Sequence, residues 1–335
     1  MSGWRERLSG AWYDPEARPP AWTRWLEPVY RLAVLTRRLL YRRGWLRSGH
    51  PGVPVVIVGN LTVGGAGKTP LVILVAQLLM ELGRRPAVVS RGYGGAEPRQ
   101  PHRVREHDSP AFAGDEPLLL AKTTACPVWI CRDRLAAARA AAAGGADVIV
   151  ADDGLQHYRL RRDFEIVVVD GVRGLGNGRC LPAGPLREPS ARLGEADLVV
   201  CNGEGHCPPG SVRMALVGDQ AVRIDASARR SLAAFAPGPV HGIAGIGHPQ
   251  RFFDFLAGHG LEVVPHPLPD HGRMPAGLLS PHDGLPVLMT SKDAVRCARM
   301  SGSGACWEVP VTADLGADAS RFRQALAGRL GMSEA

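Results

Sequence analysis

The stretch VVIVGNLTVGGAGKTP, residues 55–70, joins an apolar run to a glycine-rich loop and a lysine. The run is continuous and β-branched, as in a buried parallel strand. Residues 69–83, TPLVILVAQLLMELG, follow as an expected helix that ends near Gly83. Proteins hold nucleotide phosphates on this order of strand, glycine loop and helix, so the stretch predicts a phosphate-binding loop.

Lys68 is one of only three lysines in a chain that has 37 arginines. Its compact charge suits the β- and γ-phosphates of a nucleotide, and the hydroxyl of Thr69 suits Mg²⁺. The general phosphate-loop pattern has its first glycine where this chain has Thr62, so a glycine turn with an incidental lysine is the alternative. The expected nucleotide-binding residues are Thr62, Val63, Gly64, Gly65, Ala66, Gly67, Lys68 and Thr69.

A second expected strand ends in acidic residues. Within ADVIVADDGLQH (146–157), the apolar residues 148–151 are followed directly by Asp152 and Asp153. Ligands in open α/β sheets bind at the carboxyl ends of strands, and carboxylates are preferred ligands of Mg²⁺. The two aspartates therefore predict a magnesium site, with a helix cap or a turn as the alternative.

Further apolar runs alternate with helical ones, which indicates a mostly parallel sheet. FEIVVVDG (164–171) and ADLVVCNG (196–203) are expected strands, and DRLAAARAAAAGG (133–145) is an expected helix. The C-terminal part has the order strand, AGIG turn, helix PQRFFDFLAGHG (249–260) and strand LEVV (261–264), and we treat the turn as structural.

The expected fold class is α/β. It comprises a P-loop NTPase domain with a mostly parallel sheet, a second smaller α/β domain and an N-terminal amphipathic helix. We divide the chain into a leader (1–50), a P-loop domain (51–212) and a smaller domain (213–335) that closes the active-site cleft. The second break lies near the Gly/Pro-rich stretch GEGHCPPGS (203–211).

Bulk composition fits a folded protein that buries a large core. The chain has 335 residues, 45% of them hydrophobic and 21% charged. Its seven cysteines form no zinc spacing, so we expect free thiols in a reducing compartment. No stretch reads as a cleavable signal or as a membrane span of about 20 apolar residues.

The net charge of +8 is concentrated in the leader. Residues 1–50 hold ten arginines against four acidic residues, together with five of the seven tryptophans and three of the five tyrosines. The rest of the chain is nearly neutral, which argues against a nucleic-acid-binding protein with a broad basic face.

Residues 20–43 of the leader, PAWTRWLEPVYRLAVLTRRLLYRR, have an amphipathic pattern. Tryptophan and arginine favour the level of anionic lipid headgroups, so the pattern predicts a helix that lies in a membrane interface. An ordinary helix packed on the domain is the alternative, and Pro28 would kink the helix or mark its start. One expected face holds Arg24, Glu27, Arg31, Arg38 and Arg42, and the other holds Trp22, Trp25, Leu26, Val29, Ala33 and Leu40.

Eight stretches, in order, resemble the motifs of the tetraacyldisaccharide 4'-kinase family, which phosphorylates the lipid A precursor in Gram-negative bacteria. The resemblance spans about residues 20–300, and the Thr62 departure from the general phosphate loop is the family's own form. The stretches are VGNLTVGGAGKTP (58–70), SRGYGG (90–95), GDEP (114–117), DDGLQH (152–157), GPLREP (184–189), AGIGHPQRFF (244–253), PDHG (269–272) and TSKDAVR (290–296).

The resemblance implies a catalytic group. Asp115 would be the general base that takes the proton from the sugar 4'-hydroxyl, and His271 would pair with it from the second domain, beside Asp270. Lys68 completes this catalytic set. Alone, Asp115 would read as a helix N-terminus, and Asp270 and His271 would read as loop residues.

The resemblance also implies the binding residues, with ATP and Mg²⁺ as cofactors. Lys292 would lie near the nucleotide, although capping a helix is its alternative. Arg91 and Arg187 suit an anionic sugar phosphate, whereas alone they would read as a turn anchor and a surface ion pair. The implied metal site is Thr69, Glu116, Asp152, Asp153 and Gln156, and the implied substrate site is Asn60, Arg91, Tyr93, His157 and Arg187.

Two positions depart from the family pattern. Gly272 stands where a second histidine is usual, and Ser291 stands where glutamate is usual. The first weakens any role for a histidine pair, and the second leaves Lys292 and Asp293 as the credible residues of their motif.

The expected partners are the lipid disaccharide and, through residues 20–43, the anionic inner-membrane surface. We expect no nucleic acid and no obligate protein partner. The expected location is the cytoplasmic face of the inner membrane of a Gram-negative bacterium, with peripheral attachment. The rivals are a membrane-associated P-loop NTPase switch that acts on a protein, and a P-loop synthetase of a soluble carboxylate, which gives no reason for a membrane helix.

Overall fold

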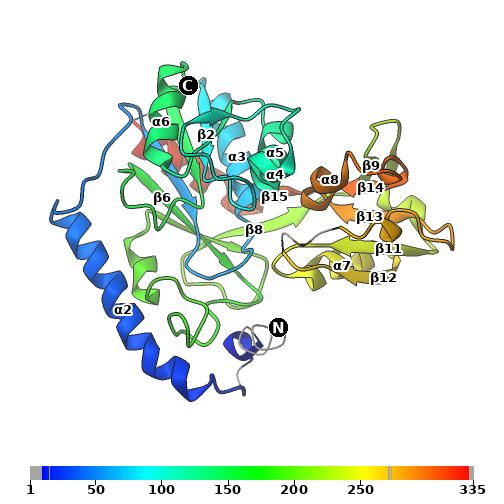
Figure 1. Cartoon of the computed structure of the whole chain (residues 1–335), viewed down its shortest axis with the longest axis horizontal. Helices are drawn as coiled ribbons and strands as arrows, with labels where there is room; N and C mark the ends of the chain where they lie inside the picture. Colours follow the sequence, from blue (N-terminus) through cyan, green and yellow to red (C-terminus); the bar gives the residue numbers. More distant parts are fainter. Residues whose placement is uncertain (1–9, 15, 271, 273, 332–335) are drawn as a thin grey trace.

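The computed structural model describes residues 10–14, 16–270, 272 and 274–331 and contains two mixed, mostly parallel sheets (Figure 1). The larger sheet has nine strands in the order β15-β8-β7-β6-β1-β5-β2-β4-β3. Their bounds are β1 (Val55–Gly59), β2 (Pro86–Ser90), β3 (His102–Arg103), β4 (Val128–Ile130), β5 (Val148–Asp152), β6 (Phe164–Asp170), β7 (Leu198–Asn202), β8 (Val212–Val217) and β15 (Thr312–Asp314).

Strand β1 lies at the centre of this sheet, between β5 and β6, and is parallel to both. All five of its residues are buried, as its uninterrupted apolar sequence predicts. Helices α3 (Lys68–Glu81), α5 (Asp115–Thr123) and α9 (Ala319–Arg329) pack on one side of the sheet, and α6 (Arg134–Ala143) packs on the other. The short helix α4 (Pro110–Ala113) leads into α5. The predicted α/β class and mostly parallel sheet are therefore confirmed.

The smaller sheet has six strands in the order β10-β9-β14-β13-β11-β12, of which β14, β13, β11 and β12 are parallel. Helix α7 (Pro249–Gly258) packs against β11 and β12, and α8 (Ser291–Cys297) follows β13. The strands are β9 (Gln220–Arg223), β10 (Arg229–Ser231), β11 (Pro239–Ala244), β12 (Glu262–Pro267), β13 (Val287–Thr290) and β14 (Trp307–Val309).

The chain leaves the larger sheet after β8, builds the smaller sheet, and returns as β15. Strand β15 pairs antiparallel with β8, and Phe322 and Leu326 of α9 join the core of the larger sheet. We therefore call residues 218–311 the second lobe and the rest the first lobe. The division at residues 212 and 213 stays a prediction, but residues 312–331 lie with the first lobe.

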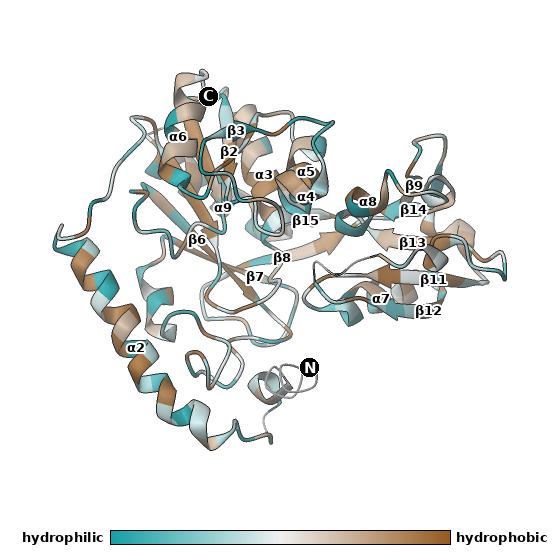
Figure 2. Ribbon diagram, in the orientation of Figure 1, coloured by the Kyte–Doolittle hydropathy of each residue, from teal (hydrophilic) through white to brown (hydrophobic). Residues whose placement is uncertain are grey.

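The leader contains helix α2 (Ala21–Arg42), which continues through Pro28 and runs along the outside of the first lobe (Figure 1). Two residues of its expected polar face bind the first lobe, since Arg38 donates to Glu195 at 2.5 Å and Glu27 accepts from Arg179 at 2.9 Å, whereas Arg24 and Arg31 are exposed. Apolar residues lie along its length (Figure 2), and Trp25 and Leu32 are 81% and 66% exposed. Within the described residues, no helix is both long and apolar enough to cross a membrane.

The cysteine prediction is wrong at one pair. Cys201 at the end of β7 and Cys207 in the following loop form a disulfide, because the turn at residues 203–206 brings the loop back beside the strand. The other five cysteines are buried free thiols, as expected: Cys126, Cys131, Cys180, Cys297 and Cys306.

Candidate active site

The phosphate-loop stretch has the predicted local structure. Strand β1 ends at Gly59, residues 60–67 form the loop, and α3 begins at Lys68. Gly67 has a φ of +84°, a conformation that a residue with a Cβ rarely adopts. Asn60 bridges the loop, since its Nδ2 donates to the carbonyl of Thr62 at 2.9 Å and its Oδ1 accepts from Lys68 Nζ at 3.0 Å.

Asp153 lies beside Lys68 because β5 and β1 are neighbours and end at the same edge of the sheet. Lys68 Nζ is 3.3 Å from Asp153 Oδ1, and Arg187 Nη1 is 3.1 Å from Oδ2. Burial alone would raise the pKa of Asp153, but the charges of Lys68 and Arg187 hold this pKa well below its usual range. Asp153 is therefore a carboxylate held between two cations.

Asp152, the last residue of β5, has the opposite environment. Burial raises its pKa to about 7, and the charges of Glu116 and Asp153 act in the same direction. Its Oδ2 lies 3.5 Å from Ser90 Oγ, whereas Oδ1 is buried without a hydrogen-bond partner. A bound divalent cation would satisfy a buried carboxylate oxygen that has no donor and lies near other acidic side chains.

The residues present therefore fit Mg²⁺. In the described part of the chain, no three histidine, cysteine or acidic side chains are grouped closely enough to hold a metal by themselves. Mg²⁺ does not require such a group, because it keeps several waters and takes phosphate oxygens as ligands beside one or two carboxylates.

The motif GDEP begins helix α5, which packs against α8 of the second lobe. Asp115 is buried, with Arg296 Nη1 of α8 at 3.9 Å from its carboxylate. Glu116 accepts from Lys292 Nζ at 3.0 Å, and Lys292 also donates to Asp270 at 2.8 Å. Asp115 and Glu116 of the first lobe thus face Arg296 and Lys292 of the second. His271, the predicted partner of Asp115, lies outside the described residues.

The structure brings only some of the predicted substrate residues together. Asn60 and Arg187 belong to the Lys68 network, in which Gln156 donates to the carbonyl of Asn60 at 3.2 Å and accepts from Arg187 at 3.3 Å. Arg91 instead pairs with Glu97 at 2.9 Å. Tyr93 is 61% exposed.

His157 lies at the edge of this group, 3.7 Å from Asp133. Burial lowers its pKa to about 4, and the charge of Arg134 adds to this effect. His157 is therefore a neutral imidazole at neutral pH.

Two polar residues of the site were not predicted from the sequence. Arg134, at the start of α6, donates to the carbonyl of Asp153 at 2.9 Å, and nothing in its sequence context marks it. Asn202 ends β7 and donates to the carbonyl of Ala66 at 3.0 Å. Asn202 directly follows an apolar strand, so the rule that selected Asp152 could also have found it.

A cavity of about 1170 Å³ flanks the phosphate loop beyond the ends of β6 and β7. Val63 and Gly64 of the loop line it, together with Tyr13, Arg173, His206 and His248. Arg173 lies over the ring of Tyr13, 4.9 Å from its centroid. The cavity thus offers aromatic and basic surfaces next to the phosphate loop.

Comparisons with known proteins identify relatives of this chain. The family model described as "Tetraacyldisaccharide-1-P 4'-kinase" (LpxK) matches residues 21–331. A tetraacyldisaccharide 4'-kinase of Alkalilimnicola ehrlichii is 50% identical over 309 residues, 88% of this chain and 90% of that protein. One of Xanthomonas campestris pv. campestris is 47% identical over 332 residues, 94% of each chain.

A solved structure is also similar. The crystal structure of an LpxK from Aquifex aeolicus, described as in complex with ATP, matches with a TM-score of 0.74 and 27% identity, over 91% of this chain and 97% of that one. The family match covers nearly the whole described chain, and identity to its members reaches half of the aligned residues. The chain belongs to the tetraacyldisaccharide-1-P 4'-kinase family.

Proposed function

We propose that this chain transfers the γ-phosphoryl group of ATP to the 4'-hydroxyl of tetraacyldisaccharide 1-phosphate, the step of lipid A biosynthesis that yields lipid IVA. Family membership over residues 21–331 supports this activity. The observation that carries it is the position of Lys68, which starts α3 and lies 3.3 Å from Asp153 at the end of the neighbouring strand. A cation beside a carboxylate at a helix N-terminus is suited to bind the phosphates of a nucleotide.

The nucleotide would lie across the loop of residues 60–67. Main-chain N–H groups and the N-terminus of α3 attract the phosphates, and Lys68 would reach the β- and γ-phosphates. The cavity beyond β6 and β7 is continuous with the loop through Val63 and Gly64, so it would take the nucleoside end of ATP. Lys68 would then exchange its contact with Asn60 for phosphate oxygens.

Mg²⁺ would be held by Thr69, Asp152 and Asp153, with Glu116 and Gln156 alongside. When bound, it would neutralise charge on the phosphates. The buried Oδ1 of Asp152, which has no donor, supports this assignment. Glu116 influences Asp152 electrostatically, which indicates that the two carboxylates share one region.

Asp115 would accept the proton of the sugar hydroxyl as that oxygen bonds to the γ-phosphorus and the bond to the β-phosphate oxygen breaks. ADP leaves with the electrons of that bond, and no phosphoenzyme forms. The position of Asp115 supports this role, because it is buried where α5 meets α8 and lies beside Arg296 of the second lobe. His271 and Asp270 would act with Asp115 from the second lobe.

The lipid would approach from the opposite side of the loop. Arg187, Arg91, Tyr93 and His157 would bind the disaccharide, and the neutral imidazole of His157 would bind without adding charge. Arg187 lies next to Asp153, so a sugar phosphate there would compete for its guanidinium.

Helix α2 would hold the enzyme on the cytoplasmic face of the inner membrane by peripheral contact. Its exposed apolar residues recur about every three or four positions, as on one side of a helix, and monomeric soluble proteins rarely expose large apolar patches to water. The exposed apolar residues are Trp22, Trp25, Leu26, Val29, Leu32, Leu35 and Leu39. Exposed arginines on the same helix, Arg24, Arg31 and Arg37, suit anionic lipid.

The test is phosphoryl transfer to the lipid. Purified protein is incubated with Mg-ATP and detergent-dispersed tetraacyldisaccharide 1-phosphate, and mass spectrometry detects one added phosphoryl group. Lys68→Ala and Asp115→Ala should each abolish the product. Lys122→Ala, which removes a largely exposed lysine of α5, should retain it.

A different result would support the rival protein. Nucleotide hydrolysis that is independent of lipid, that Lys68→Ala abolishes, and that yields no phosphorylated disaccharide would indicate a P-loop NTPase acting on another partner.

A further inference from the structure

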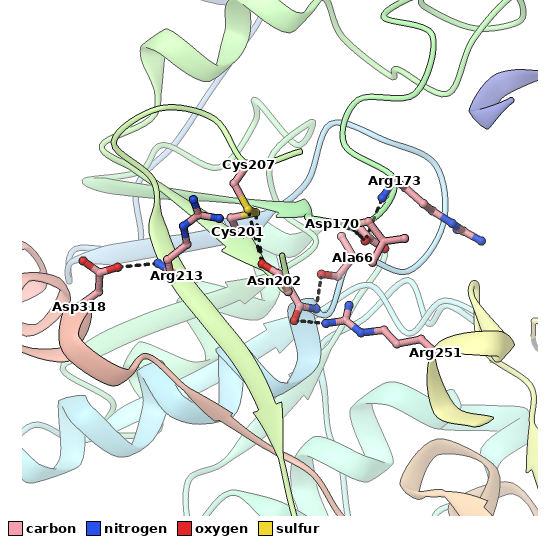
Figure 3. The surroundings of a disulfide bond; sticks show 11 residues. Ala66, Asp170, Arg173, Cys201, Asn202, Cys207, Arg213, Arg251 and Asp318 are labelled. Atoms are coloured by element: carbon pink, nitrogen blue, oxygen red, sulfur yellow. Dashed lines mark hydrogen bonds between the residues drawn. A yellow bond between two sulfur atoms is a disulfide. The ribbon is translucent and has the colours of Figure 1, made fainter. Parts of the chain in front are cut away.

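Asn202 connects the phosphate loop with the second lobe. It ends β7 and is completely buried. Its Nδ2 donates to the carbonyl of Ala66 in the phosphate loop at 3.0 Å, and its Oδ1 accepts from Arg251 Nη2 of α7 at 2.6 Å (Figure 3). One amide therefore binds a main-chain group of the first lobe and a guanidinium of the second.

The contact with the phosphate loop is close. A Cβ on Gly67 would lie 2.0 Å from Asn202 Nδ2, so the glycine allows the side chain to reach the loop. Because the carbonyl and N–H of a trans peptide point in opposite directions, the bond to the carbonyl of Ala66 also fixes the N–H of Gly67 away from Asn202. That N–H is one of the donors that a phosphate loop offers to a nucleotide.

The second lobe meets the same loop at another point. Arg173 donates to the carbonyl of Gly247 at 2.8 Å, and a Cβ on Gly247 would lie 2.5 Å from the nitrogen of Gly65. Gly247 belongs to the AGIG turn that leads into α7, which carries Arg251. The turn that the sequence presents as structural thus packs directly on the phosphate loop.

We propose that Asn202 is a positioning residue for nucleotide use: it couples the placement of α7, through Arg251, to the orientation of the Ala66–Gly67 peptide in the phosphate loop. This inference rests on the proposed function only in naming ATP as the nucleotide. An asparagine suits the role because its amide donates on one side and accepts on the other. The charge of Arg251 polarises the amide and strengthens its donation to Ala66.

Asn202→Asp separates the two contacts. Aspartate keeps an acceptor for Arg251 but cannot donate to the carbonyl of Ala66. We expect the KM for ATP to rise at least tenfold and the affinity for a fluorescent ATP analogue to fall equally, with the melting temperature within a few degrees of wild type. A structural role alone would lower the melting temperature and leave the KM of the folded fraction unchanged.

Arg251→Ala removes the other contact and leaves the core of β7 intact, so it tests the coupling even if Asn202→Asp fails to fold. We expect a threefold to tenfold rise in the KM for ATP, partly restored in Arg251→Lys. In the double variant the two effects should not multiply, because both act through one amide. Arg213→Ala, on the neighbouring β8 and exposed, should match wild type.

Wild-type nucleotide affinity in both Asn202→Asp and Arg251→Ala would overturn the proposal, as would fully multiplicative effects in the double variant. The analogue-binding measurement needs no lipid. If lipid phosphorylation were absent from wild type while the binding effects held, the proposed function would fail and the coupling would stand.

Discussion

Lys292 of α8 donates a hydrogen bond to Glu116 of α5 at 3.0 Å, although 176 residues separate them. The same ammonium lies 2.8 Å from Asp270. The burial of Lys292 would lower its pKa, but the two carboxylates outweigh this effect and raise the pKa above its ordinary value. One buried cation therefore joins acidic groups of both lobes at the predicted catalytic group.

Replacing this cation should affect catalysis. In Lys292→Met, Glu116 and Asp270 lose a shared counter-charge, so kcat should fall about 10- to 100-fold, with Lys292→Arg retaining more activity. Steady-state transfer assays measure the effect. Lys122→Met is the matched control, because Lys122 also joins α5 to the second lobe, through Glu308, but its side chain is 57% exposed. Equal activities of the Lys292 and Lys122 variants would contradict this prediction.

Two glycines flank α3 with similar backbone conformations, and only one should be essential. Gly67 has φ +84° and Gly83 has φ +74°. A Cβ at Gly67 would collide with Asn202, whereas one at Gly83 would meet nothing within 4 Å. Gly83→Ala should cost about 1 kcal/mol of unfolding free energy from backbone strain alone. Gly67→Ala should also weaken ATP-analogue binding at least tenfold, and a variant with unchanged binding would refute the close approach.

The exposed face of α2 predicts a specific lipid dependence. The double variant Trp22→Ser, Trp25→Ser should lose most of its binding to vesicles that contain anionic phospholipid, since both rings lie on the outward surface. Vesicle sedimentation measures the bound fraction. Val264→Ser, which changes an exposed apolar residue of β12, is the control and should bind normally. Normal binding by the tryptophan variant would exclude this face as the contact surface.

His157 predicts a pH dependence of stability. Its pKa is about 4 in the folded protein, against 6.5 as the ordinary value. As pH falls from 6.5 toward 4, His157 therefore binds a proton in the unfolded chain but not in the folded chain. The stabilisation is complete above pH 6.5 and falls by about 2 kcal/mol at pH 5. Urea unfolding of His157→Asn should lack this part of the pH dependence, and identical pH profiles would disprove it.

The disulfide between Cys201 and Cys207 closes a short loop, with a sequence separation of 6. Loop-closure entropy gives about 2 kcal/mol of stabilisation for a loop of this size. Dithiothreitol should lower the melting temperature of the wild-type protein but leave that of Cys207→Ser unchanged. A wild-type melting temperature that is the same with and without dithiothreitol would count against the disulfide.

Much of the fold could be predicted because its signals are local. The apolar run before Asn60 predicted β1, and the glycine loop predicted the start of α3. The other apolar runs predicted both ends of β5, β6 and β7 to within two residues. Asp152 and Asp153 were placed at a strand end by the same local pattern. The proximity of Lys68 to Asp153 follows from strand order, since β1 and β5 are neighbours.

The contacts between lobes had no such signal. The pairs Lys292–Glu116 and Arg251–Asn202 depend on how two sheets meet, which no periodicity in the sequence encodes. The amphipathic pattern of residues 20–43 predicted helix α2, but it did not predict which side of the helix contacts the protein. The same pattern would result if the apolar side were buried, and the pairs Arg38–Glu195 and Glu27–Arg179 are what hold this helix with its apolar residues outward.

The return of the chain through β15 makes the second lobe an insertion between two paired strands. Val217, the last residue of β8, is the register partner of Thr312, the first residue of β15. A tight hairpin turn between these two positions could therefore replace residues 218–311 without removing a strand from the larger sheet. Both ends of the lobe are fixed side by side on one antiparallel ladder, so the lobe joins the rest of the molecule through two adjacent chain crossings.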